Sequence, residues 1–289
     1  MIVQAAHADA TPAGDRRAFY RGVLECLNAA GLDYLVGGAF AMAGVTGIAA
    51  RTKDLDLFVR KGDVTKTLDL LRQAGFAAEL AFPHWLAKVR CGTEVIDIIF
   101  NSGNGESPVD DSWFLHALPA EIDGVTVKLC AVEEMIWTKA FVMERERYDG
   151  ADVAHLLRSG GERLDWPRLL HRFGNHWPVL LSHLVLFSYI YPGEAHRVPS
   201  AVLAELIACF TQTIGEPAAN SKLCRGGLLS RAQYAVDVLD WGYADARLPP
   251  EGHMSAEELR VWNDAAPEPQ RLNGGAAARA GATDRRKHG

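Results

Sequence analysis

The apolar positions of roughly the first half of the chain follow two patterns, short runs and longer segments with a helical period. Runs of about four to eight apolar or β-branched residues are typical of strands, whereas apolar positions that recur every three or four residues are typical of helices. The helical period predicts helices at 16–30, 39–49 and 64–75, with Gly31 and Gly75 as stops and Asp63 as the cap of the third. The apolar runs predict strands at 32–36, 54–60, 76–80, 85–90 and 93–100.

Turn-forming residues join several of these strands. Cys91-Gly92 separates the last two runs, which predicts an antiparallel pair, and Asp123-Gly124 within EIDGVTV is a second hairpin signal. The segment NSGNGESPVDDSW at 101–113 is rich in turn formers, so it predicts a surface loop that follows the strand at 93–100. This loop either contacts a substrate or is a simple connection.

From position 131 onward the helical period dominates. The segment 132–158 predicts two helices that meet near 148–150, and further helices are expected at 165–173, 178–190, 199–214 and 230–241. Beyond 251 the chain is rich in Pro, Gly, Ala and Arg, and it contains too few apolar residues to pack. We therefore predict an α+β protein with a flexible N-terminus at 1–15, a core with a mixed sheet flanked by helices at 16–130, a C-terminal helical domain at 131–250 and a disordered tail at 251–289.

Charge and cysteine usage narrow the class of protein. The formal net charge is −6 with a pI near 5.9, so the chain as a whole is not drawn to nucleic acid, although a local basic groove is still compatible with RNA. The five cysteines contain no CxxC pair, which argues against a zinc knuckle and a disulfide framework. The N-terminus lacks a signal-peptide apolar segment and 178–191 is too short to span a membrane, which predicts a cytoplasmic protein.

The first candidate for chemistry is a pair of carboxylates on one strand. In the run DLDLFV, Asp54 and Asp56 are two positions apart, so in a strand both side chains point to one face while Leu55 and Leu57 point to the other. Two adjacent carboxylates repel each other unless a cation lies between them, and hard divalent cations such as Mg²⁺ prefer carboxylate oxygen. As an alternative, the two acids lie on a strand face that is exposed to solvent. The apolar residues that flank them argue against this alternative.

A glycine pair precedes the carboxylates. Gly37 and Gly38 lie between a predicted strand and a predicted helix, where glycine lets the backbone approach a phosphate and the first helical N–H groups point toward it. The sequence therefore predicts a metal site and a phosphate site close together.

Together these residues resemble the nucleotidyltransferase superfamily typified by DNA polymerase β. The signature of that superfamily is an apolar residue followed by Gly-Gly or Gly-Ser and later by Asp-apolar-Asp-apolar, which Val36-Gly37-Gly38 and Asp54-Leu55-Asp56-Leu57 match. The branch that resembles this chain includes abortive-infection-type toxins and minimal nucleotidyltransferases. The family pattern includes a third carboxylate on a later strand, and Asp97 in TEVIDIIF supplies one. A buried, hydrogen-bonded strand aspartate is the alternative role for Asp97.

The resemblance implies an NTP substrate and two Mg²⁺ ions held by Asp54, Asp56 and Asp97, with Asp97 also helping to deprotonate the attacking hydroxyl. Arg51 and Lys53 are placed to meet phosphate charge, although the strand alternation directs Lys53 away from Asp54. As an alternative, both cations are exposed and balance nearby acids.

The segment that begins at Lys139 is similar to a helical signature of the same branch, in which a helix lysine faces the nucleotide. Carried over by position, Lys139 contacts the nucleotide, while Arg145 or Arg147 joins Asp149 and Asp152 in a polar junction. For Asp152 and Arg147 we prefer a structural salt bridge. The chain departs from the pattern by having Tyr148 and Asp149 where the family often has a basic residue followed by Asp.

The acceptor of the transferred group is not readable from the sequence. Relatives in this superfamily act on RNA ends, on proteins or on small antibiotics, and a toxin-like member implies an antitoxin partner. A non-catalytic nucleotide-binding or interaction module of the same fold is a second hypothesis. A hydrolase with an Asp-x-Asp metal site is a third, which the preceding glycine pair disfavours.

Overall fold

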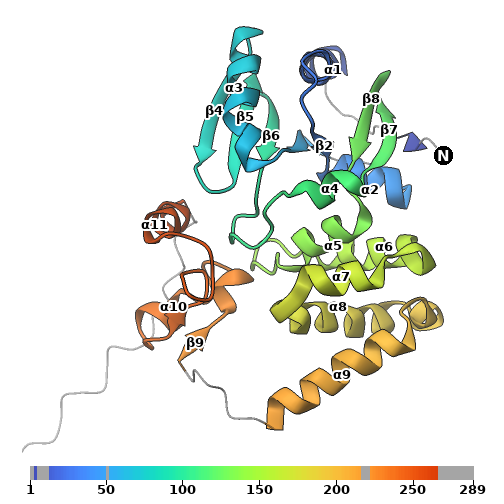
Figure 1. Ribbon diagram of the computed structural model, residues 1–289, viewed down its shortest axis with the longest axis vertical. Coiled ribbons are helices and arrows are strands. Elements are labelled where there is room, and N and C mark those ends of the chain that lie inside the picture. The colour runs from blue at the N-terminus through green and yellow to red at the C-terminus, as the bar shows by residue number, and fades with distance from the viewer. Residues whose placement is uncertain (1–2, 5–12, 50–51, 216–221, 266–289) are drawn as a thin grey trace, which may run out of the picture.

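A computed structural model describes residues 3–4, 13–49, 52–215 and 222–265. Its centre is an eight-stranded sheet with the strand order β1-β7-β8-β2-β3-β6-β5-β4 (Figure 1). The strands in chain order are β1 (Val3–Gln4), β2 (Leu35–Val36), β3 (Asp54–Phe58), β4 (Ala77–Phe82), β5 (Leu86–Cys91), β6 (Glu94–Ile99), β7 (Leu118–Ile122) and β8 (Val125–Leu129). The sheet is mixed, as predicted, because β3 pairs in parallel with β6 and antiparallel with β2.

Both predicted hairpins are present. Strands β5 and β6 form an antiparallel pair, and so do β7 and β8. At the second turn Asp123 and Gly124 have φ values of 48° and 81°, the left-handed conformation that a two-residue hairpin turn needs. Strand β1, which pairs with β7, lies inside the segment 1–15 that we expected to be flexible, and most of that segment is outside the described residues.

Three helices accompany the first half of the sheet: α1 (Ala13–Ala29), α2 (Gly38–Thr46) and α3 (Val64–Gln73). Helix α1 packs against α3, β6 and β8, and it buries Tyr20, Val23, Leu24 and Leu27, which recur at the helical spacing seen in the sequence. Our prediction that the Asp63 side chain caps α3 is wrong. Asp63 occupies the N-cap position, but its side chain makes no capping bond and its backbone oxygen accepts the Thr67 hydroxyl instead, at 2.8 Å.

The helices after β6 form a layer beneath the sheet in Figure 1, with α4 preceding β7 and the others following β8. They are α4 (Asp111–Leu115), α5 (Val132–Ala140), α6 (Gly150–Gly160), α7 (Trp166–Phe173), α8 (Trp177–Ile190) and α9 (Ser200–Gly215). Short 3₁₀ turns lie at Lys61–Asp63, Gly161–Arg163, Gly174–His176, Pro192–Arg197 and Gly226–Leu228. Buried residues of α5, such as Met135 and Ile136, belong to the same hydrophobic core as Leu35 of the sheet, and α2 contacts both β3 and the helices α5 and α6.

The C-terminal part differs most from the sequence-based expectation. It contains β9 (Leu223–Cys224), α10 (Ala235–Leu239), β10 (Ala244–Asp245) and α11 (Ala256–Asp264). The predicted helix at 230–241 is reduced to α10. The prediction of disorder from 251 is wrong for α11, because Ser255 and Glu258 form a capping box and Trp262 packs against aromatic side chains of the β4–β5 hairpin. Residues 266–289 of the expected tail lie outside the described residues.

Among the described residues, no helix is both long enough and apolar enough to cross a membrane.

Candidate active site

The two carboxylates of β3 share one face of the sheet. Leu55 and Leu57 are fully buried on the opposite face, whereas Asp54 and Asp56 line a cleft. The alternation inferred from the sequence is therefore present. The Thr52 hydroxyl donates to Asp54 Oδ1 at 2.6 Å, which fixes the first carboxylate at the start of the strand.

The parallel register of β3 and β6 brings Asp97 beside this pair. Asp56 lies directly opposite Asp97 across the two strands, and Asp97 also lines the cleft. Burial, together with the neighbouring charges of Asp54 and Asp97, raises the pKa of Asp56 to about 7. Burial also raises the pKa of Asp97, against the opposing effect of Lys88. Three carboxylates that were separated in sequence therefore interact electrostatically at one place.

Lys88 is a member of this site that the sequence reasoning missed. It lies on β5 directly opposite Asp97, and its Nζ donates to Asp97 Oδ1 at 2.6 Å. The register of the hairpin between β5 and β6 could have identified Lys88 as the partner of Asp97. In the structure Cys91 pairs with Glu94, so the turn of this hairpin is Gly92-Thr93. The turn predicted from the sequence, Cys91-Gly92, lies one residue earlier and therefore places a different residue opposite Asp97.

The glycine pair lies directly against the strand of carboxylates. The Gly37 N–H donates to the backbone oxygen of Asp56 at 2.9 Å, and Gly38 begins α2 with a φ of +53°. A Cβ added to Gly37 would lie 2.1 Å from the Phe58 ring, and one added to Gly38 would lie 1.6 Å from Asp56 Oδ2. Both positions require glycine for close approach, and Gly38 also requires it for its backbone conformation.

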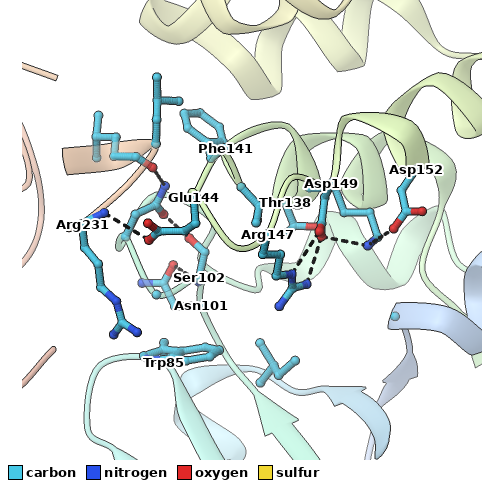
Figure 2. Close-up of a pocket in the computed structure, with 18 of the residues that line it drawn as sticks. Trp85, Asn101, Ser102, Thr138, Phe141, Glu144, Arg147, Asp149, Asp152 and Arg231 are labelled. Atoms are coloured by element: carbon cyan, nitrogen blue, oxygen red, sulfur yellow. Dashed lines mark hydrogen bonds and ion pairs between the residues drawn. The ribbon is translucent and has the colours of Figure 1, made fainter. Parts of the chain in front are cut away.

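The carboxylates open into a cleft of roughly 1940 Å³. Figure 2 shows other residues that line it, among them Ser102, Arg147 and Arg231. Its walls come from β3 and β6, from the loop after β6, from α5 and the segment that follows it, and from the C-terminal residues around α10 and α11. Asn101, Ser102 and Asn104 of the loop line the cleft. The C-terminal wall, which includes Arg231, Trp241 and Trp262, was not anticipated.

Across the cleft lies a junction of cations and acids between α5 and α6. Lys139 Nζ donates to Asp149 Oδ2 at 3.1 Å and to Asp152 Oδ2 at 2.6 Å. Arg147 donates to both oxygens of Asp149, at 3.0 and 2.9 Å, as Figure 2 shows. Burial favours a higher pKa for Asp149, but the bonds from Arg147 and the charge of Lys139 lower it overall. The charges of Lys139 and Arg147 also act to lower the pKa of Asp56, which places them within electrostatic reach of the carboxylates.

The structure connects the remaining predicted site residues less directly to the cleft. Arg51 lies outside the described residues. Lys53 is exposed and is not among the described residues that line the cleft, and its backbone oxygen accepts the Tyr20 hydroxyl. Gly37 is buried, and Gly38 is among the residues that line the cleft. Within the described part of the chain no three His, Cys, Asp or Glu side chains already converge as a set of metal ligands.

A family model described as an uncharacterised nucleotidyltransferase matches residues 19–177, more than half of the 289 residues. None of the curated proteins compared with the chain matches it. Among solved structures, the antibiotic-resistance factor ANT(2″)-Ia is 15% identical, with a TM-score of 0.39 over 57% of this chain and 95% of that chain.

Two further structures have comparable similarity. A lincosamide antibiotic adenylyltransferase with bound lincomycin is 14% identical, with a TM-score of 0.36 over 49% of this chain and 95% of that chain. An antigenic nucleotidyltransferase-like protein from Paracoccidioides brasiliensis is 17% identical, with a TM-score of 0.34 over 59% of this chain and 92% of that chain.

Proposed function

The chain belongs to the family of uncharacterised nucleotidyltransferases, and from this premise we propose that it moves a nucleoside monophosphate from an NTP to an acceptor hydroxyl in a Mg²⁺-dependent reaction. The acceptor oxygen attacks the α-phosphorus, a new P–O bond forms, and the bond to the β-phosphate oxygen breaks to release pyrophosphate. The hydroxyl proton passes to a base. The single observation that carries this proposal is the register that places Asp97 beside Asp56, in a cleft that also contains Asp54.

The donor chemistry at Asp54 and Asp56 fits a divalent cation. Both side chains offer carboxylate oxygen, which Mg²⁺ prefers, and within the described residues no side chain donates a hydrogen bond to the Asp56 carboxylate. Burial is the main cause of the raised pKa of Asp56, and repulsion from Asp54 and Asp97 adds to it. A bound Mg²⁺ would neutralise this charge and that of the triphosphate.

Phosphate recognition is assigned to the glycine turn and to nearby cations. Gly37 and Gly38 bring the N-terminus of α2 against the carboxylates, so the first helical N–H groups are available to phosphate oxygens. Lys139 supplies positive charge from across the cleft, held in position by its two aspartate partners. Arg51 and Lys53, which precede the first aspartate, remain proposed contacts to the triphosphate.

Asp97 is the proposed base for the acceptor hydroxyl, because it lies beside the metal-binding pair and opens onto the same cleft. The cleft, at roughly 1940 Å³, exceeds the size of a typical single-ligand pocket, so an acceptor has room beside the nucleotide. RNA, a protein or a small molecule remain the proposed acceptor classes, and a toxin-like role with an antitoxin partner remains part of the proposal.

The proposal is tested by incubating the purified protein with Mg²⁺ and each α-³²P-labelled NTP, with and without total RNA and cell lysate. We expect label on RNA, on a protein band or on a small molecule resolved by chromatography. Asp54→Asn and Asp56→Asn should reduce labelling by about 100-fold or more, since each removes a metal ligand. Asp240→Asn, which changes an exposed cleft carboxylate away from the strand, is the matched control.

A second candidate function is a non-catalytic nucleotide-binding module of the same fold. The pairing of Lys88 with Asp97 favours it, because that pairing reduces the availability of one Asp97 oxygen. NTP binding without label transfer to any fraction would support this module. Labelling that persists in both strand variants would refute the proposed role of the aspartates.

A further inference from the structure

Three side chains form a row across adjacent strands of the sheet. Lys88 on β5 lies opposite Asp97 on β6, and Asp97 lies opposite Asp56 on β3. Directly opposite residues on neighbouring strands project to the same face. The order of charges along the row is therefore cation, carboxylate, carboxylate, with Asp54 two positions away on the same face.

Lys88 makes a close contact with Asp97. Its Nζ lies 2.6 Å from Asp97 Oδ1, and the two side chains are only 24% and 14% exposed. An ion pair with this degree of shielding is screened less by solvent than an exposed pair. The oxygen that Lys88 occupies is one that a divalent ion bound to Asp97 would also use.

The other two carboxylates differ from Asp97 in this respect. Asp54 accepts a neutral hydroxyl from Thr52, and no cationic side chain within the described residues donates to Asp54 or Asp56. Within the described residues, Asp97 therefore has a cation in direct contact, whereas Lys139 and Arg147 act on Asp56 at longer range. Three ionised carboxylates carry three negative charges, of which Lys88 balances one and a single divalent ion balances the other two.

Building on the proposed function, we propose that Lys88 takes the place of a second divalent ion, so that the active site binds one ion, at Asp54 and Asp56. The Lys88 ammonium group supplies positive charge at Asp97 and holds this carboxylate toward β5. This differs from the two ions that the family resemblance implies. Lys88 is thus a positioning residue for Asp97, and it determines the number of metal ions.

The test is a count of bound ions. Binding of Mn²⁺ is measured by electron paramagnetic resonance of the free ion, with the full chain alone and with a non-hydrolysable ATP analogue. We expect one Mn²⁺ per chain for the wild type. Lys88→Met should bind two, because it removes the competing cation and leaves the Asp97 oxygens available, whereas Lys88→Arg retains the charge and should bind one.

Each outcome distinguishes this inference from the proposed function. Two ions in the wild type, or one ion in a folded Lys88→Met variant, would overturn the role of Lys88 and leave the transferase intact. If Lys88→Met does not fold, the wild-type count decides by itself, since two ions there exclude the substitution of an ion by Lys88. No Mn²⁺ binding, or binding unchanged in Asp54→Asn, would overturn the metal site of the proposed function.

Discussion

Gly38 and Asp56 lie so close together that no side chain fits between them. A Cβ on Gly38 would lie 1.6 Å from Asp56 Oδ2, far inside the contact distance of two atoms. The glycine therefore does two things, since it adopts a φ of +53° at the start of α2 and it leaves room for the central carboxylate of the site.

Gly38→Ala should reduce transferase activity by about 100-fold, because the added methyl group displaces Asp56 by about an ångström or more. Gly47→Ala is the matched control. Gly47 also has a positive φ, of 72°, but nothing lies within 4 Å of its added Cβ. Each substitution should cost about 1 kcal/mol of stability from the backbone alone. Activity assays and urea unfolding of both variants test this, and equal activity in the two would contradict the role of the Gly38–Asp56 contact.

A second prediction concerns the buried ion cluster between α5 and α7. Glu134 is fully buried and accepts from Arg168 at 2.7 Å and from Arg172 at 3.2 Å. Glu134→Gln should lower the free energy of unfolding by about 2 kcal/mol, because it removes a buried negative charge that Arg168 and Arg172 share, while Arg168 keeps its pair with Glu133 and Arg172 its pair with Asp110. Glu257→Gln removes an exposed partner of Arg260 and should leave stability unchanged. Urea denaturation curves compare the two, and similar small effects would show that the cluster contributes little.

The third prediction is a pH dependence of stability. His183 is buried, and its Nε2 lies 2.9 Å from the Ala140 backbone oxygen, to which the neutral ring donates. Burial lowers its pKa below the ordinary value of 6.5, although the bond to Ala140 opposes this shift. The unfolded chain then binds a proton that the folded chain does not. The stability from His183 is thus present above pH 6.5 and is lost as the pH falls toward the folded-state pKa.

Replacing His183 with Gln retains a donor but removes this titration. Between pH 7 and pH 5 the wild type should lose more stability than His183→Gln, by up to about 1.4 kcal/mol per pH unit. The exposed His116 gives the control variant His116→Gln, which should follow the wild type. Parallel pH profiles of the wild type and His183→Gln in chemical denaturation would rule out the assignment.

A fourth prediction concerns the docking of α11. The Trp262 ring lies 5.2 Å from that of Phe82 and 5.3 Å from that of Trp85, both in edge-to-face geometry. Trp262→Ala should raise the amide exchange rates of α11 about tenfold, because such contacts contribute about 1.5 kcal/mol. Trp241→Ala, which removes a more exposed tryptophan of the cleft, should leave them unchanged. Hydrogen exchange measured by mass spectrometry reports both, and unchanged exchange in Trp262→Ala would show that other contacts hold α11.

The sequence by itself determined the parts of the site that depend on local geometry. The two-residue period of a strand places Asp54 and Asp56 on one face, and a glycine pair between a strand and a helix marks a close approach. The same local rules gave both hairpins and most helices, because apolar periodicity and turn chemistry operate within a few residues.

Only the tertiary structure decided which distant residues meet. The contact of Lys88 with Asp97 depends on a hairpin register that changes with one residue of turn position. Trp262 of α11 packs against aromatic residues far away in sequence, a contact that local composition does not report. The composition of a segment shows how much apolar surface it has, but the tertiary structure determines whether that surface is buried against another part of the chain. The tertiary structure also determines which charged residues lie beside the three carboxylates.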